Sequence, residues 1–307
     1  MTDAGGRSSD AGELRPLLFS IAYRMLASVA EAEDVVQEAY LRYERALADG
    51  ATVESPKAYL SAVVTRLAID ELRSARRRRE TYSGQWLPEP LLTDDRAADP
   101  ALAAEESDSL SMAFLLLLER LGPVERAVFL LHDVFGYEHR EIAGIVGKSE
   151  ENSRQIARRA RRHVEAGRPR FEASREQRVR LAERFFAAVS DGDVDGLVEL
   201  LAADAVVHGD GGGKAPQWSR PIAGAERVAR LLAGVGRQIR EHRGSLRLHE
   251  VNGQPGAVVV GPDGGLINVF AIDIAEGAVQ TVRSVINPDK LQHLGPVADV
   301  WALLRDA

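Results

Sequence analysis

The residues best suited to binding a polyanion lie between Ser149 and Arg162. Apolar residues recur at helical spacing on one side of this stretch, while arginine and amide side chains crowd the other. In a major groove, arginine binds guanine and amide side chains bind adenine through paired hydrogen bonds. On a helix that binds DNA, Asn152, Arg154, Gln155 and Arg158 would be best placed to reach base edges, and Arg159, Arg161 and Arg162 would suit phosphates. The spacing does not settle which base each side chain would read.

Two short helices are needed to position these side chains. Apolar residues from Ile142 to Val146 predict one helix, and Gly147 allows the left-handed conformation that ends it. Ser149 is typical of an N-cap for the second helix. The pattern predicts a helix-turn-helix whose second helix enters a major groove. The alternative is a solvated helix pair with an arginine-rich surface.

The composition indicates a globular protein with unevenly distributed charge. The 307 residues carry a formal net charge of -7, and there is no cysteine, which excludes disulfides and Cys-ligated zinc. No signal peptide or apolar run long enough to cross a bilayer is found, so we expect a cytoplasmic protein. Basic residues cluster at 73–79 and 154–162, and acidic residues at 31–38 and 89–108. This distribution predicts DNA contact at two places and a basic protein partner elsewhere.

The first half of the chain reads as helices. Ser28 and Glu31 form a capping-box pattern before a helix whose predicted buried stripe runs from Val36 to Leu47. The opposite face presents Glu33, Asp34, Gln37 and Glu38. A third helix begins at Pro56 and ends in the arginine run 76–79. Residues 81–108 contain three prolines and many acids, which predicts a linker before further helices at 109–121 and 123–135.

The second half changes character after a plausible hinge at 167–170. Helices are expected near 176–190, 193–202 and 224–240, with a strand at 205–208 and a glycine loop at 210–214. Four alternating stretches then predict antiparallel strands with one buried face. We expect an α+β cone with an internal cavity, followed by a short helix at 296–305.

Several segments together resemble an extracytoplasmic-function sigma factor. They are EAEDVVQEAYLRYERA, YLSAVVTRLAIDELRSARRRR and the LGPVERAVFLL, REIAGIVGKSE and RRARRHV segments, which span about 10–166. The motifs WLPEP (86–90), DGGGK (210–214) and NPDKL (287–291) resemble the subgroup with a fused C-terminal SnoaL-like domain of the NTF2-like fold. The fold class implied is multidomain, with two all-α sigma domains followed by an α+β NTF2-like cone.

The resemblance implies five segments: a region 2 domain at 10–80, a linker at 81–108, a region 4 domain at 109–166, a SnoaL-like domain at 175–293 and a tail at 294–307. It also implies core RNA polymerase (clamp and flap) and promoter DNA as partners. Region 4 would read the -35 element through Asn152, Arg154, Gln155, Arg158, Arg159 and Arg162. Region 2 would meet the -10 element through Arg66, Asp70, Arg73, Arg76 and Arg77, and the polymerase through Glu33, Asp34, Gln37 and Glu38.

Our hypothesis for the C-terminal domain is regulation in cis, which makes a separate anti-sigma factor unnecessary. The residues expected to pack the domains together are Trp86, Leu87, Pro88, Asp210, Gly211, Gly212, Gly213, Lys214, Asn287, Pro288, Asp289, Lys290 and Leu291. We expect Lys214 to meet a linker carboxylate such as Glu89. An unidentified small ligand in the cone is left open. We expect no membrane association, cofactor, metal or catalysis.

Two alternatives belong to other classes of protein. One is an enzyme tethered by its helical half, with His208, Asp210 and Lys214 near a cavity mouth. The other is a DNA-binding repressor or activator that works without polymerase. The acidic face at 31–38 and the two separate basic patches argue against that second alternative.

Overall fold

The computed structural model describes residues 11–94, 108–166 and 174–305, with the side chains of 75–80 and 304 left out. Contacts divide the chain into two units, each described here by itself. One unit contains residues 1–80 and 117–168, and the other contains 81–116 and 169–307. The stretch expected as an interdomain linker, 81–108, therefore falls within the unit that holds the C-terminal domain. The expected hinge at 167–170 lies outside the described residues.

The N-terminal unit begins with three helices: α2 (Arg15–Leu26), α3 (Val29–Ala48) and α4 (Pro56–Glu80). Ser28 caps α3 by accepting a hydrogen bond from the Glu31 amide at 3.2 Å, as the capping pattern predicts. Apolar side chains from all three helices pack together, among them Ile21, Val36 and Leu60. Leu47, which was expected in the buried stripe, is instead exposed because it lies in the last turn of α3.

The same unit continues with α7 (Pro123–Phe129), a π-helical turn η1 (Leu130–Val134), α8 (His139–Val146) and α9 (Glu150–Glu165). Gly147 ends α8 in the left-handed conformation at φ 66°, and Ser149 caps α9 by accepting from the Asn152 amide. Ile156, Ala157 and Ala160 are buried on one side of α9. The predicted helix-turn-helix is present in the structure.

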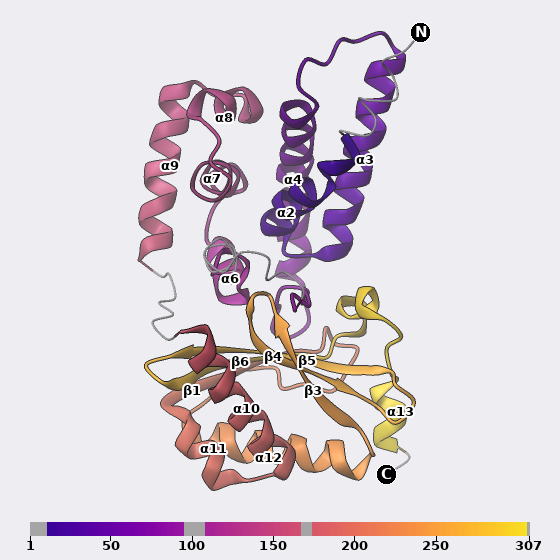
Figure 1. Cartoon of the computed structure of the whole chain (residues 1–307), viewed down its shortest axis with the longest axis vertical. Coiled ribbons are helices and arrows are strands. Elements are labelled where there is room, and N and C mark those ends of the chain that lie inside the picture. The colour runs from indigo at the N-terminus through magenta and orange to yellow at the C-terminus, as the bar shows by residue number, and fades with distance from the viewer. Residues whose placement is uncertain (1–10, 95–107, 167–173, 306–307) are drawn as a thin grey trace. The chain divides into compact units, whose positions relative to one another are not determined.

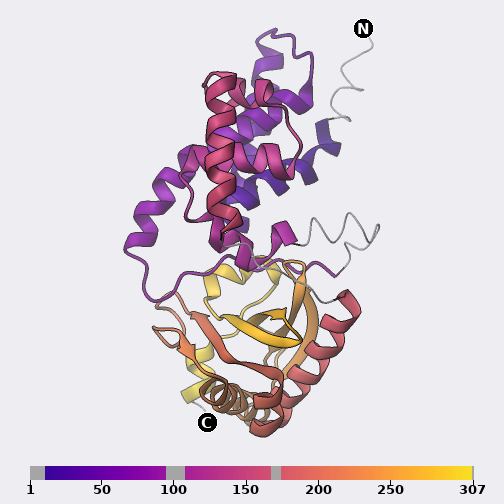
Figure 2. The ribbon, with the colours of Figure 1, turned by 90° about the vertical axis from the view of Figure 1, so that its left-hand side faces the viewer.

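The C-terminal unit is an α+β cone (Figures 1 and 2). Helices α10 (Arg175–Asp191), α11 (Val194–Leu200) and α12 (Ala225–Glu241) lie along one face of a curved sheet. The described strands are β1 (Leu201–Asp210), β2 (Ile222–Ala223), β3 (Ser245–Val251), β4 (Gln254–Val260), β5 (Leu266–Ala275) and β6 (Ala278–Val285), in the order β2-β1-β6-β5-β4-β3. The pairs from β3 to β6 are antiparallel, as expected, and β1 runs parallel to β6.

The central strands are buried on both faces, whereas the sequence predicted one buried face. In β4, Ala257 and Val259 join the core beneath the helices, while Val258 and Val260 join a second core on the opposite face. That second core includes Leu87 and Met112 from the stretch before the C-terminal domain. The N-terminal end of this unit therefore completes the fold of the cone.

Short elements finish the unit. They are α6 (Met112–Leu118), which continues into the N-terminal unit, the 3-10 turns η2 (Pro288–Lys290) and η3 (Gln292–Leu294), and α13 (Val300–Arg305). Helical domains followed by an α+β cone confirm the expected fold class. Within the part of the chain that the structure describes, no helix is long and apolar enough to span a membrane.

Candidate functional sites

The polar side of α9 is exposed along its length. Asn152, Arg154, Gln155, Arg158, Arg159 and Arg162 are all solvent-exposed, opposite the buried face of the helix. Three arginines already have acidic neighbours: Arg154 pairs with Glu150, Arg159 with Glu125, and Arg161 with Asp133. These pairs are exposed at the arginine end, so each holds its guanidinium weakly. A phosphate could therefore replace the carboxylates.

Helix α4 carries the residues assigned to the -10 element. Asp70 and Arg73 are exposed and form an ion pair of 2.8 Å one turn apart. Arg66 instead donates to the backbone of α8, at 2.8 Å to the oxygens of both Gly144 and Ile145. The side chains of Arg76 and Arg77 lie outside the described residues, although their backbone belongs to α4.

The acidic face of α3 is partly neutralised by arginines of the same unit. Glu33 accepts a hydrogen bond from Arg15, and Glu38 accepts one from Arg42 at 2.7 Å. Asp34 and Gln37 are exposed. The face therefore offers polar acceptors to a partner, as its sequence predicts.

Within the N-terminal unit, the helices expected to form separate domains contact each other. Arg126 on α7 is buried and donates to the Met25 oxygen at the end of α2 at 2.6 Å. The Tyr137 hydroxyl donates to the Ser61 hydroxyl on α4 at 2.7 Å. Burial raises the pKa of Tyr137, so this hydroxyl stays protonated and can donate at neutral pH. These bonds join α7 to α2, and together with Arg66 they join α4 to α8 and to the turn that precedes it.

In the C-terminal unit, the three motifs meet at one buried carboxylate. Asp210, which ends β1, has no exposed surface. One carboxylate oxygen accepts from the Tyr82 hydroxyl at 2.5 Å and the Gly212 amide at 3.0 Å. The other accepts from the Leu87 amide at 2.8 Å and Lys290 Nζ at 2.7 Å. Four donors saturate the carboxylate and compensate for its burial. We call this arrangement of Asp210, Lys290 and their partners the clasp.

Lys290 supplies the positive charge of the clasp. Its ammonium also donates to the Leu87 oxygen, and it lies 4.5 Å from the ring centroid of Trp86 and 5.0 Å from that of Tyr82. Aromatic faces attract a desolvated cation. Burial and the neighbouring Asp210 carboxylate raise the pKa of Tyr82 above its ordinary value, so its hydroxyl remains a donor. The motif residues Trp86, Leu87, Asp210 and Lys290 are thus held together.

The glycine loop 211–213 fits closely beneath NPDKL. Gly212 has φ 59°, and a side chain there would meet Asn287 Nδ2 at 2.2 Å. A side chain on Gly211 would meet the Ala215 oxygen at 2.5 Å. Asn287 in turn donates to the Tyr82 hydroxyl at 2.8 Å. Gly211 and Gly212 allow this close approach, because a side chain at either position would clash.

Lys214 does not pair with Glu89 as expected. Its ammonium forms an exposed ion pair of 2.6 Å with Asp289 of NPDKL. Glu89 is largely buried beside Pro88 and Pro90 in the stretch before the sheet. Leu291 is fully buried in the second core, and Pro288 starts η2. The glycine loop and NPDKL therefore contact each other as well as the preceding stretch.

Residues 91–93 pair with the end of β3 as a short additional strand. Asn252 N donates to the Leu91 oxygen and Thr93 N donates to the Glu250 oxygen, both at 2.8 Å. Leu92 and Val251 lie opposite each other between these bonds in an antiparallel bridge. The Asn252 side chain accepts from the Leu91 amide at 2.9 Å. We call residues 82–94, from the clasp to this pairing, the strap.

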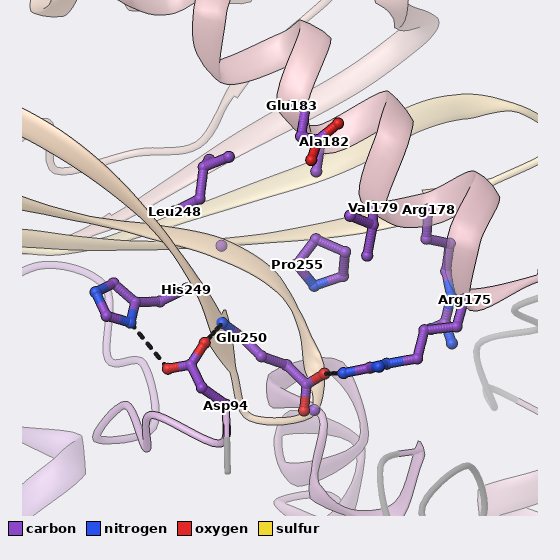
Figure 3. A pocket seen from close by; sticks show the side chains of 12 residues that line it. Asp94, Arg175, Arg178, Val179, Ala182, Glu183, Leu248, His249, Glu250 and Pro255 are labelled. Atoms are coloured by element: carbon purple, nitrogen blue, oxygen red, sulfur yellow. Dashed lines mark hydrogen bonds and ion pairs between the residues drawn. The ribbon is translucent and has the colours of Figure 1, made fainter. Parts of the chain in front are cut away.

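The strap ends at Asp94, beside a pocket of about 220 Å³ (Figure 3). Its carboxylate accepts from the Glu250 amide at 2.7 Å and contacts His249 Nδ1 at 2.8 Å. Burial opposes ionisation of Asp94, but these hydrogen bonds and His249 outweigh burial and lower its pKa. Arg175 pairs with Glu250 on the other side of the pocket at 2.8 Å.

The residues considered for catalysis each have a partner in the structure. His208 Nδ1 contacts the Gln85 side chain of the strap at 3.0 Å, and burial, with Arg283 nearby, lowers the pKa of His208. Asp210 belongs to the clasp, and Lys214 is paired with Asp289. Among the described residues, no cluster of histidine and carboxylate side chains could hold a metal ion.

The arrangement of helices and cone corresponds to three known families. The chain matches the Sigma-70 region 2 family over residues 11–78 and the Sigma-70, region 4 family over residues 111–164. It matches the SnoaL-like domain family over residues 182–285. These matches define a class of protein in which sigma regions are joined to a SnoaL-like domain.

The relatives make the family more specific. The ECF RNA polymerase sigma factor SigJ of Mycobacterium tuberculosis is 38% identical over 290 residues, which cover 92% of each chain. The probable ECF RNA polymerase sigma factor SigI of the same organism is 32% identical and covers 91% of this chain and 93% of its own. A crystal structure of SigJ has a TM-score of 0.73 and 36% identity, and covers 95% of this chain and 100% of that one. The chain belongs to the ECF RNA polymerase sigma factors.

This membership gives the general activity. Sigma factors bind core RNA polymerase and promoter DNA and direct transcription initiation, and they are not enzymes.

Sequence reasoning missed several residues that hold the strap: Tyr82, Gln85, Leu91, Thr93, His249 and Asn252. The sequence signal that was available was the apolar pair Trp86 and Leu87 within an acidic stretch, because such side chains require a pocket.

Proposed function

We propose that the SnoaL-like domain regulates the sigma domains in cis by binding the strap. The strap cannot lie in the clasp and at the same time follow a path through core polymerase. Closing the clasp therefore limits initiation, and opening it releases residues 82–94 for the polymerase. The observation that carries this proposal is the buried Asp210 carboxylate. It accepts a hydrogen bond from the Leu87 amide, while Lys290 donates one to the Leu87 backbone oxygen.

The acidic end of the strap supports a competition of this kind. The positively charged channel of the polymerase and the cone would bind the same segment. In the structure, Asp94 is held by Glu250 and His249, while Asp95 and Asp99 lie outside the described residues. Neutralising all three aspartates is expected to alter the pattern of abortive transcripts. A normal pattern would contradict passage of this segment through the channel.

For region 2 we propose that the -10 element is contacted by Arg66, Asp70, Arg73, Arg76 and Arg77. The packing of α4 against α8 supports a closed state that precedes promoter binding, since Arg66 is engaged by the Gly144 and Ile145 oxygens. Opening would break these hydrogen bonds and free the guanidinium for phosphate, where an ion pair replaces bonds to uncharged carbonyl oxygens.

For region 4 we propose that α9 reads the -35 element through Asn152, Arg154, Gln155, Arg158, Arg159 and Arg162. The exposure of this face supports the assignment. For polymerase binding we propose the face of α3 that carries Glu33, Asp34, Gln37 and Glu38. Its partial neutralisation by Arg15 and Arg42 implies that a basic partner helix would exchange these ion pairs for its own.

Transcription in vitro with core RNA polymerase tests the regulation. The full chain is compared with a chain ending near Arg170 on a pool of genomic promoters. We expect both to need core polymerase and to start at shared sites, with a different yield. Equal yields would contradict regulation by the SnoaL-like domain, and failure of both to initiate would contradict the proposed promoter contacts.

A further inference from the structure

A largely apolar cavity lies in the C-terminal unit on the helix side of the sheet. The cavity has a volume of about 370 Å³. It is lined by α12, by strands β4 to β6, by residues 216–218 and by Val300 and Leu303 of α13. Small-molecule sites usually occupy ~300–1,000 Å³, so the volume suits a small ligand. The lining is part of one unit and is distinct from the clasp.

The lining determines which ligands can enter. Among the described residues around the cavity, no side chain is an aspartate, glutamate, lysine or arginine. Leu231, Val235 and Ile239 of α12 face Val259 and Ile267 of the sheet across it. An ionised ligand would lose its hydration without gaining a charged partner. The cavity therefore favours a neutral and mostly apolar molecule.

Two ring nitrogens in this lining lack partners within the described residues. Trp218 Nε1 and His242 Nε2 are both buried and form no hydrogen bond there. His242 Nδ1 contacts the backbone oxygen of Gln238 at 2.7 Å and must donate to it. This leaves Nε2 as an acceptor in the neutral tautomer of the ring. Trp218 Nε1 can only donate. Buried polar atoms without partners cost free energy and call for an explanation.

We propose that this cavity binds a neutral, mostly apolar small molecule that carries a hydroxyl group or a similar donor and acceptor pair. The ligand accepts from Trp218 Nε1 or donates to His242 Nε2. Ser284 is not available for this role because its hydroxyl already accepts from Gln217 and Asn268 and donates to Asn268.

The cavity is connected to the strap through the segment that follows the glycine loop. Gln85 of the strap donates to the Trp218 oxygen at 3.3 Å. On the outer side, Trp301 of α13 donates from Nε1 to the Lys214 oxygen at 2.8 Å. A ligand that contacts Trp218 and α13 therefore affects both ends of the segment 214–218. Ligand binding is expected to tighten the strap, an inference that rests on the regulation proposed above.

Titration of the full chain with 2-naphthol tests the site, because this neutral bicyclic molecule carries one hydroxyl. We expect saturable binding with one molecule per chain. Val235→Phe, which fills the cavity, should abolish it, whereas the same change at the exposed Val179 should leave it unchanged. Ile267→Phe on the opposite wall is the second blocking variant. Trp218→Phe should weaken binding about tenfold through the lost donor.

Absence of saturable binding, or undiminished binding by both blocking variants, would overturn the site. Hydrogen exchange of the Leu87 amide, measured with and without 2-naphthol, tests the connection to the strap. Slower exchange with the probe is expected. Binding without any change in exchange would overturn the connection alone. Both readouts are independent of transcription, so failure of the proposed regulation would show only in the transcription assay.

Discussion

At the scale of single residues, Asp210 explains why three separated motifs belong together. A buried carboxylate is tolerated only where charge and hydrogen bonds compensate for lost hydration. Lys290 provides the charge, and Tyr82, Leu87 and Gly212 provide the remaining donors. Because two of these donors come from the strap, releasing the strap would leave the Asp210 and Lys290 pair incompletely satisfied.

Lys290→Met is expected to lower the free energy of unfolding of the C-terminal unit by about 3–5 kcal/mol, because it leaves Asp210 buried without its cation. Lys214→Met is the matched control and should cost about 0–1 kcal/mol, since the Lys214 and Asp289 pair is exposed. Urea unfolding of both variants measures the difference. Similar losses in the two variants would contradict the role given to Lys290.

His208 is expected to make stability depend on pH. Its pKa is lowered in the folded protein by burial and by Arg283, so the unfolded chain takes up a proton first as pH falls. The stabilisation is therefore complete above the unfolded pKa of about 6.5 and is lost as pH falls toward the folded value. The drop in Tm between pH 7.5 and pH 5.5 should be smaller in His208→Gln than in the wild type. An equal drop would contradict the lowered pKa of His208.

The sequence was sufficient to identify the motif residues but not their partners. Trp86 and Leu87 could be recognised because apolar side chains in an acidic stretch need burial. The pairing of Lys214 with Asp289 in place of Glu89 could not be foreseen, because each carboxylate belongs to a motif. Only the folded path of the chain decides which of the two lies beside Lys214. Tyr82 carries no local signal of its role, since its partner Asp210 lies 128 residues away.

At the scale of elements, the strap acts as a component of the cone. Residues 91–93 extend the edge at β3, and Leu87 covers the second face of the sheet. The helices and strands of the cone were largely predictable from their periodicity. Burial on both faces of β4 and β5 was not predicted, although both strands are nearly continuous apolar runs, and the element that covers the second face could not be named from the sequence.

Gly212→Ala is expected to loosen the strap. At φ 59° the new methyl group would meet Asn287 Nδ2 at 2.2 Å and displace the side chain that binds Tyr82. Gly264→Ala is the control, because Gly264 also has positive φ but a methyl group there would meet nothing within 4 Å. Both variants bear the left-handed strain of about 1–2 kcal/mol. Only Gly212→Ala should speed hydrogen exchange at the Leu87 amide, and equal exchange in both would contradict the close fit.

Arg158→Ala on α9 is expected to reduce discrimination at the -35 element by about 1–3 kcal/mol, because a base contact would be lost. Arg161→Ala is the comparison, since Arg161 is engaged by Asp133 and is assigned to phosphate. Binding of the holoenzyme to promoters with single -35 substitutions measures both effects. Unchanged discrimination in Arg158→Ala would remove Arg158 from the proposed reading face.

At the scale of the whole molecule, each unit is held by contacts that the proposed function requires promoter binding to change. In the N-terminal unit, Arg66 and Tyr137 tie α4 to the region 4 helices. In the C-terminal unit, the clasp holds the strap. The sequence indicated these regions as separate domains because each has its own helical pattern. The sequence could not reveal how the region 2 and region 4 helices pack within the N-terminal unit, since the hydrogen bonds of Arg66 and Arg126 to backbone oxygens leave no pattern of residue types.

Release of the strap is proposed to control initiation, and a reversible cross-link between the strap and β3 tests this control. The chain has no cysteine, and Leu92 and Val251 form a non-hydrogen-bonded antiparallel pair, whose close spacing suits a disulfide. The double variant Leu92→Cys with Val251→Cys is assayed in transcription with core polymerase, oxidised and reduced, beside each single variant. We predict low yield when oxidised and near wild-type yield when reduced, at unchanged start sites. Equal yield in the two states would contradict control of initiation by the strap.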